Sequence, residues 1–226
     1  MEKQRARTSA DKATRREQIL DAGRGCLDDA ELDEFTMDAV AASLGLAKGT
    51  LYRYVPTREA LLLAILEDDL GEWFDAVDAK LPTLTGARRL TNLLVSTLTA
   101  RPRLMRVLSV LQSVLERNVP HDTALEFKLF LLHRSAITGG LIDAALSAKR
   151  GSGVHLLVHL HAGVIGLYNA AHPAPVVATV LAEPRFAPLR VDLRRELTHL
   201  VDALIAAIPV TATPAATAAS LGGTDP

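Results

Sequence analysis

The segment at residues 36–54, TMDAVAASLGLAKGTLYRY, constrains the fold more than any other part of this 226-residue chain. Small apolar residues recur at helical spacing up to Leu44, with Thr36 as the expected N-cap. Gly45 follows where the chain must reverse, and glycine accepts the left-handed backbone that such a turn commonly needs. Two short helices joined by a tight turn are predicted, which is the pattern of a helix-turn-helix.

The second helix of this motif, expected to run for about two turns, carries side chains suited to a wet, charged surface. They are Lys48, Gly49, Thr50, Tyr52, Arg53 and Tyr54. Small polar groups, phenols and cations suit the major groove of DNA and its flanking phosphates better than a core. The alternatives are that both tyrosines are half-buried packing residues, that Arg53 is only solvated, and that Lys48 lies near DNA without reading it.

Composition favours helices throughout, since hydrophobic residues make up 49% of the chain, aromatic residues only 4%, and alanine and leucine dominate. The formal net charge is −1, so attraction to DNA has to come from a local patch. Residues 1–16 contain six Lys or Arg and two acids, which gives +4. We expect residues 1–13 to be a flexible basic arm that reaches DNA, or else a solubilising tail.

The expected fold is all-α: a three-helix helix-turn-helix head at residues 14–60, joined by a long connector helix to a helical bundle at residues 61–208. Apolar periodicity and prolines at the boundaries predict these helices. Their ranges are about 14–30, 57–80 with Thr57 as cap, 86–100, 102–116, 121–148, 154–171 and 192–208, with a shorter helix near 175–182. Residues 209–226 are rich in Thr, Ala, Gly and Pro and are expected to be disordered.

Three segments together resemble the N-terminal domain of TetR-family bacterial transcriptional regulators. They are TRREQILDAG at 14–23, FTMDAVAASLGLAKGTLYRYV at 35–55 and PTREALLLAIL at 56–66. The resemblance is specific because order and spacing agree over this whole run. It implies an all-α homodimer with its heads in successive major grooves of a palindromic operator. It also implies a C-terminal domain that dimerises and binds a small-molecule inducer, and repression as the usual outcome.

The same resemblance implies a role for each residue of the motif. Thr36 would contact a phosphate. The residues expected near base edges are Lys48, Gly49 and Thr50. The residues expected at phosphates and sugars are Tyr52, Arg53 and Tyr54, with Arg53 also in reach of a base.

Two positions depart from the usual family pattern. Val55 replaces a common aromatic residue, which removes some packing from the core of the head. Thr57 and Arg58 stand where Ser-Lys is common, and Arg58 is expected to meet a phosphate from the N-terminus of the connector helix. Neither change removes the expectation of DNA binding.

The remaining features favour a cytoplasmic protein. The single Cys26 excludes an internal disulfide and is expected in the core. No secretory signal is recognised, and the longest apolar stretch, residues 154–171, contains three histidines and is expected to be a buried helix rather than a membrane span.

Two C-terminal helices are expected to form a four-helix interface between two copies. Residues 192–208 place an apolar stripe along one face, and residues 154–171 are apolar nearly all round, with Gly163 and Gly166 permitting close approach. The alternative is that both helices only close the core of one chain. His155, His159 and His161 have spacing compatible with metal ligation, but no Cys or carboxylate signature accompanies them, so no metal site is predicted.

An inducer cavity is expected among the helices of the C-terminal half. The candidate lining residues are Leu104, Leu108, Leu111, Gln112, Phe127, Phe130, Leu131, His133 and Asn169. A lining so poor in charge predicts an apolar or amphipathic effector. No catalytic residue, cofactor or nucleotide fingerprint is recognised, so an enzyme is not predicted. A constitutive DNA-binding protein without an effector is the alternative to a ligand-released repressor.

Overall fold

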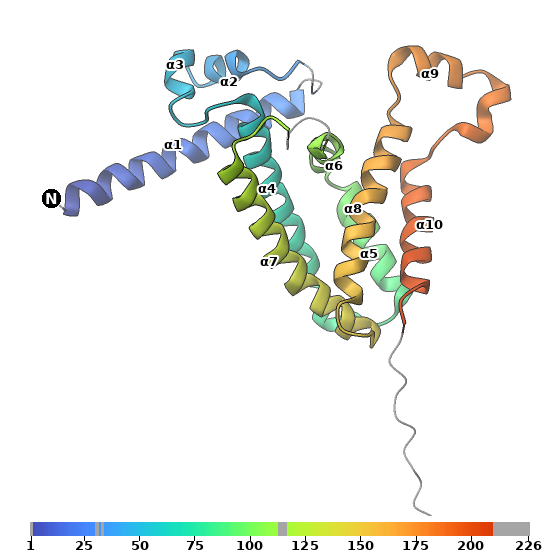
Figure 1. The fold of residues 1–226 in the computed structure, drawn as a ribbon. Coiled ribbons are helices and arrows are strands. Elements are labelled where there is room, and N and C mark those ends of the chain that lie inside the picture. Colours follow the sequence, from blue (N-terminus) through green and yellow to red (C-terminus); the bar gives the residue numbers. More distant parts are fainter. Residues whose placement is uncertain (1, 30–31, 33, 113–116, 210–226) are drawn as a thin grey trace, which may run out of the picture.

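The computed structural model describes residues 2–29, 32, 34–112 and 117–209, and within these residues it contains helices and no strand (Figure 1). The predicted all-α fold is confirmed. The N-terminal half contains four helices: α1 (Glu2–Asp29), α2 (Met37–Ser43), α3 (Lys48–Leu51) and α4 (Arg58–Asp78). The rest contains η1 (Leu81–Thr83), α5 (Ala87–Thr99), α6 (Pro102–Ser109), α7 (His121–Leu146), α8 (Ser152–Ala171), α9 (Pro175–Leu181), η3 (Pro184–Leu189) and α10 (Leu193–Ala206).

Local rules explain the boundaries of the head. The hydroxyls of Thr36 and Thr57 accept hydrogen bonds from backbone amides three residues ahead, at 3.2 Å and 3.0 Å, so both predicted N-caps are confirmed. Gly45 has φ of +64° at the reversal between α2 and α3, the conformation for which glycine was expected there. Helix α2 then buries Val40 and Ala41 against α1.

Helix α1 begins much earlier than the predicted start near residue 14, and the segment predicted as a flexible arm is helical from Glu2 onward. The physical reason is composition, because residues 2–13 include no proline or glycine and several strong helix formers. Ile19 and Leu27 are fully buried on its inner face, while Cys26 is half-buried. The predicted disorder of residues 210–226, and the predicted continuation of α6 through residues 113–116, lie outside the described residues.

Helix α4 connects the two halves, since it packs against α1 on one side and against α5, α6 and α7 on the others. Figure 1 shows α4 and α7 side by side, with α8 and α10 forming the opposite wall. Arg134 of α7 holds Asp75 and Asp78 of α4 at 2.6 Å and 3.2 Å. The Thr138 hydroxyl also donates to Asp78 at 2.6 Å, so these two helices are fixed by polar contacts as well as by apolar packing.

The turn between α7 and α8 is tightly built. The carboxylate of Asp143 accepts from the amides of Gly151 and Gly153 at 2.7 Å and 2.6 Å, which satisfies the first amides of α8. Gly153 lies so close to Gly139 that an added Cβ would be 2.2 Å from the Gly139 carbonyl oxygen. The two helices can therefore approach this closely only because both positions lack a side chain.

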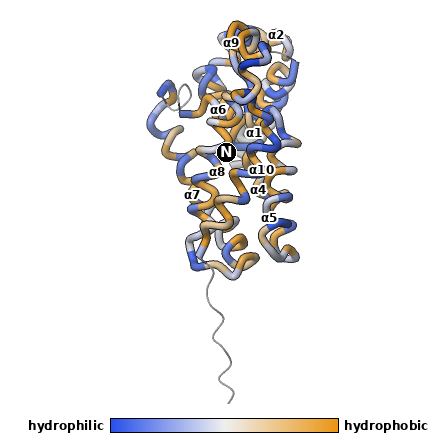
Figure 2. The backbone as a smooth tube through the Cα atoms, turned by 90° about the vertical axis from the view of Figure 1, so that its right-hand side faces the viewer, coloured by the Kyte–Doolittle hydropathy of each residue, from blue (hydrophilic) through white to orange (hydrophobic). Residues whose placement is uncertain are grey.

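Between α8 and α10 the chain leaves the bundle as an arm formed by α9 and η3. Neither element buries any residue, and Val176 and Leu189 are 73% and 63% exposed. Arg190 closes the arm on itself by donating to the carbonyls of Leu181 and Ala182. The arm lies at the same end of the molecule as the head (Figure 1), and Figure 2 shows hydrophobic segments along α9.

Helices α7 and α8 are each long and apolar enough to cross a membrane, by length and composition alone. Only 17% and 22% of the residues in their most apolar stretches are buried in a single chain, and α8, predicted to be buried, is covered on one face. Its buried face includes Leu156, Leu160 and Val164. The outer face remains uncovered in a single chain.

Candidate DNA-binding face and inner cavity

The six residues predicted to meet DNA form one continuous segment of the head, here called the recognition surface: Lys48, Gly49, Thr50, Tyr52, Arg53 and Tyr54. All are exposed except Thr50, which is partly exposed, whereas Leu51 among them is fully buried. Helix α3 is shorter than the predicted two turns, because it ends at Leu51. The next residues continue as hydrogen-bonded turns, with the Tyr54 amide donating to the Leu51 carbonyl at 2.9 Å. Leu51 thus anchors a surface that otherwise faces outward.

Both tyrosines of the recognition surface are exposed over part of their side chains. Tyr52 is 40% exposed and Tyr54 is 37% exposed, so each ring is partly packed and partly open to solvent. This arrangement is compatible with the packing role and with a hydroxyl that reaches a phosphate. The Thr36 hydroxyl accepts a hydrogen bond as N-cap and retains its own proton for donation to another group.

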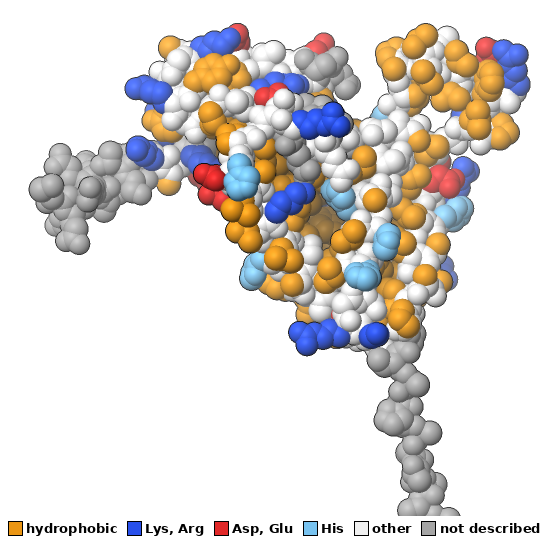
Figure 3. Space-filling view, in the orientation of Figure 1, with side chains coloured by type: hydrophobic (Ala, Val, Ile, Leu, Met, Phe, Trp, Pro, Cys, Tyr) orange, Lys and Arg blue, Asp and Glu red, His pale blue; other side chains and the backbone are white. Residues whose placement is uncertain are grey.

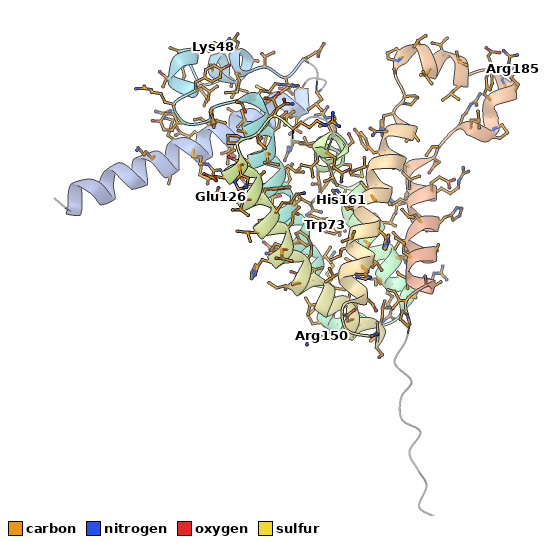
Figure 4. All side chains as sticks on the ribbon, viewed as in Figure 1. Lys48, Trp73, Glu126, Arg150, His161 and Arg185 are labelled. Atoms are coloured by element: carbon orange, nitrogen blue, oxygen red, sulfur yellow. The ribbon has the colours of Figure 1, made fainter. Side chains whose placement is uncertain are left out.

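Lys48 forms an ion pair with Asp38 of α2, with Nζ 2.8 Å from the carboxylate. Both side chains are more than half exposed, so the pair is worth little to stability. The hydrogen bond to Asp38 raises the pKa of Lys48 above its ordinary value. Lys48 is therefore positively charged, and it lies on the outside of the head (Figure 4). A DNA phosphate would compete with Asp38 for it.

Arg58, which the sequence predicts to meet a phosphate, also makes contacts within the head. Its guanidinium points into the head, where Nε donates to the Phe35 carbonyl at 2.7 Å and Nη2 donates to the Leu32 carbonyl. The same group lies over the Phe35 ring, 5.9 Å from its centroid. Arg58 fixes the loop between α1 and α2 to the start of α4, and these bonds use two of its five N–H donors.

A cluster of ion pairs joins the end of α1 to α4 and α6. Arg103 of α6 is bidentate to Asp69 of α4, at 2.9 Å and 3.0 Å, and its third nitrogen is 2.6 Å from Asp28 of α1. Asp69 is only 4% exposed, and both carboxylates raise the pKa of Arg103. Arg106 of α6 also donates to the Leu27 carbonyl in the last turn of α1. We call these contacts the α1–α6 clamp.

The clamp was not predicted from the sequence. A signal was present, because Asp68 and Asp69 interrupt an otherwise apolar face of α4. A carboxylate in a core position requires a cation or several donors. Their partners lie far away in sequence, however, at positions that no local pattern identifies.

A cavity of about 380 Å³ lies between α4, α6, α7 and α8 (Figure 3 shows its hollow, with apolar side chains inside). Four of the predicted residues line it, and these are Leu108, Leu111, Gln112 and Leu131. Trp73 and Phe74 of α4 and one face of α8 also line it, although the sequence did not indicate them. Trp73 and His161 face the same interior space (Figure 4). The indole nitrogen of Trp73 donates to the Thr97 hydroxyl at 3.1 Å.

The other five predicted lining residues lie elsewhere. Leu104 and Phe127 are core residues, each 1% exposed, and Phe130 packs against Phe74 with ring centroids 6.4 Å apart. His133 is exposed on α7, and Asn169 is exposed near the end of α8. The reason is helix geometry, because residues that share an element present different faces, and only the packing decides which face meets the cavity.

The three neighbouring histidines of α8 do not converge. His155 and His159 are exposed, and the imidazole Nδ1 of His159 is 2.8 Å from the His155 carbonyl, whereas His161 lines the cavity. Across the described part of the chain, no group of three His, Cys, Asp or Glu side chains is arranged to hold a metal ion.

Comparison with known families accounts for both halves of the chain. The profile of "Bacterial regulatory proteins, tetR family" matches residues 19–65, and the profile of "Tetracyclin repressor-like, C-terminal domain" matches residues 67–211. The chain belongs to the TetR family. The boundary between the two matches falls in α4, the helix that connects the head to the bundle.

One solved structure supports the TetR fold. A protein from Mesorhizobium loti MAFF303099, described as a TetR-family transcriptional regulator, aligns with a TM-score of 0.50 at 15% identity, over 88% of this chain and 98% of its own. The fatty acid degradation regulator FadR from Bacillus halodurans aligns with a TM-score of 0.48 at 17% identity, over 82% of this chain and 97% of its own, which is too distant to carry an argument. A search of curated proteins gave no match.

TetR-family membership identifies a DNA-binding transcriptional regulator. The resemblance recognised from the sequence is therefore confirmed. Proteins of this family bind DNA operators, usually as dimers with small-molecule effectors.

Proposed function

We propose that this TetR-family protein is a homodimeric, cytoplasmic repressor that a small molecule releases from a palindromic operator. The proposed division assigns DNA binding to residues 14–60, with residues 1–13 as a basic extension, and effector binding and dimerisation to residues 61–208. One observation carries the proposal. The same chain has an outward-facing recognition surface on its head and a cavity of about 380 Å³ in its second domain. A constitutive DNA-binding protein has no need of that cavity.

The proposed DNA contacts are those of the recognition surface and of Thr36. Thr50 and Gly49 suit close approach to base edges, while Tyr52 and Tyr54 suit phosphates and sugars. Arg58 remains a proposed phosphate contact, because it is partly exposed and its bonds within the head use two of its five N–H donors. One short recognition helix reads few base pairs. Sequence-specific binding therefore favours two copies of the protein on a two-fold symmetric site.

The proposed release mechanism runs through α6. Leu108 of α6 lines the cavity, and the same helix carries Arg103 and Arg106 of the α1–α6 clamp. A ligand that displaces α6 would therefore alter contacts with the end of α1, and through α1 the position of the head. Operator and effector would then bind preferentially to two different states of one equilibrium.

The proposed dimer uses the outer face of α8 together with α10. Val158 of α8 is 59% exposed, and next to it Ala162 and Gly166 leave room for close approach of a second helix. The apolar stripe of α10 is partly used within the chain, where Leu197 and Val201 are fully buried. Sedimentation should report two chains, and Gly166→Arg, which fills the open face of α8, should give folded monomers.

The experiment that tests the function is selection of genomic DNA fragments by the purified protein at about 0.15 M salt, with excess competitor DNA. A single palindromic site is expected, resistant to competitor. Diffuse binding that disappears with moderate salt would contradict a sequence-specific repressor.

A further inference from the structure

The buried part of the cavity lining is wholly apolar. Seventeen described residues line the cavity, and the nine of them that are buried are all Leu, Val, Trp or Phe. Every polar residue of the lining is exposed or half-buried, and these are Gln112, Lys128, Ser135 and His161. Burial of a polar group without a partner is costly, so the inner part of the cavity favours the hydrocarbon part of a ligand over its polar part.

The inner wall on α4 consists of two buried aromatic rings, those of Trp73 and Phe74, with centroids 5.0 Å apart. Their one polar side-chain atom, the indole nitrogen of Trp73, donates to the Thr97 hydroxyl at 3.1 Å. That hydroxyl in turn donates to the Leu93 carbonyl at 2.7 Å. The two rings therefore offer a ligand apolar contact area and no hydrogen bond that is still to be made.

The open side of the cavity lies at α7 and at the residues that follow α6. Lys128 and Leu132 of α7 and Gln112 beyond α6 are exposed lining residues, and Leu132 is 67% exposed. Figure 3 shows the hollow open to solvent, with apolar side chains inside. A ligand would keep a polar end at this opening and place its apolar end against α4. This orientation needs no charge on the lining, because water at the opening solvates the polar end.

The volume limits the size of the ligand. At about 30 Å³ for each non-hydrogen atom, as for water in the liquid, 380 Å³ holds about a dozen such atoms. We infer that the cavity binds a mainly apolar molecule of this size, with its polar group at one end, and that burial of its hydrocarbon provides the affinity. The inference rests on the proposed function in taking this cavity as the effector site.

The chain contains a built-in reporter for the test, because its only tryptophan, Trp73, lines the cavity. Fluorescence of the full-length protein would be titrated with 1-hexanol, 1-octanol and 1-decanol, each below its solubility limit. Each added CH₂ should tighten binding about three- to fourfold, because it is buried against apolar side chains. A response that does not saturate, or an affinity that does not rise with chain length, would overturn the inference.

A second hydroxyl tests the apolar inner end. Decane-1,10-diol has the chain of 1-decanol but has to place one hydroxyl among the buried apolar residues. It should therefore bind at least about tenfold more weakly than 1-decanol. A diol that binds as tightly as 1-decanol would overturn the inference.

A size-specific variant locates the binding. Val164 lines the cavity and is 1% exposed, so Val164→Phe places a ring in the buried part of the cavity. It should weaken 1-decanol at least about tenfold and 1-hexanol less than about threefold, because the shorter chain needs less of the volume. Val180→Phe, at a 45% exposed position of α9, is the matched control and should leave both affinities unchanged. A Val164→Phe protein that is folded by circular dichroism and keeps its affinity for 1-decanol would overturn the inference.

The same ligands separate this inference from the proposed function. Binding of 1-decanol at Trp73 that leaves affinity for the selected DNA site unchanged would support the ligand class and contradict the release mechanism. Specific DNA binding, together with a diol that binds as tightly as 1-decanol, would support the regulator and contradict the ligand class.

Discussion

Replacing Arg103 with Met tests the α1–α6 clamp directly. The change removes two hydrogen bonds to Asp69 and one to Asp28, and it leaves the 4% exposed Asp69 carboxylate without its bidentate partner. Loss of one partner of a buried pair costs about 3–5 kcal/mol. Arg24, 3.9 Å away, still faces Asp69, and Arg103 itself is 24% exposed, so about 3 kcal/mol is expected.

The assay is urea unfolding at fixed protein concentration, since the stability of a dimer depends on concentration. With a slope of about 3 kcal/mol per M, the midpoint should fall by about 1 M. Arg195→Met, which removes the exposed pair with Glu196, is the control and should change stability by no more than about 0.5 kcal/mol. A loss under about 1 kcal/mol for Arg103→Met would refute the reasoning, as would a double variant with Asp69→Leu that is no more stable than Arg103→Met alone.

Three further predictions follow from the packing, charge and exposure of single residues. Gly153→Ala should cost about 2–3 kcal/mol in urea unfolding because its Cβ would strike the Gly139 carbonyl, whereas Gly140→Ala in α7, exposed and with open space around it, should be neutral or slightly stabilising. Burial, followed by the charges of neighbouring acids, raises the pKa of Glu67, so the folded state retains its proton to higher pH than the unfolded chain does. Glu67→Gln should therefore raise unfolding free energy at pH 7, and the gain should vanish below about pH 4; a gain that persists at pH 3 would contradict this. Tyr54→Ala should weaken binding to the selected DNA site about tenfold in a mobility-shift titration with an unchanged urea midpoint, and unchanged affinity would remove Tyr54 from the proposed contacts.

The head was predictable because its signals are local. Thr36 and Thr57 cap helices through amides three residues away, and Gly45 adopts the backbone conformation that its position requires. The start of α1 was not predicted, because basic charge was taken as a sign of flexibility although the segment contains good helix formers. Charge patterns alone do not decide helix boundaries.

The parts that the sequence did not reveal depend on distant contacts. Arg58 and the carbonyls of Phe35 and Leu32 are more than twenty positions apart, so the sequence did not show that two of its donors bind within the head. The clamp and the cavity were not predicted for the same reason. Arg103 meets Asp28 across 75 positions, and which faces of α4 and α8 border the cavity is fixed only when the helices pack.

The most direct test of a sequence-specific dimer is a hydroxyl-radical footprint of the full-length protein on its selected genomic site, for the wild type and for Tyr54→Ala at the same concentration. The account predicts two protected half-sites related by two-fold symmetry and one helical turn or a multiple of it apart, with protection lost in the variant. Uniform protection without symmetric half-sites, or an identical footprint from the variant, would contradict the account.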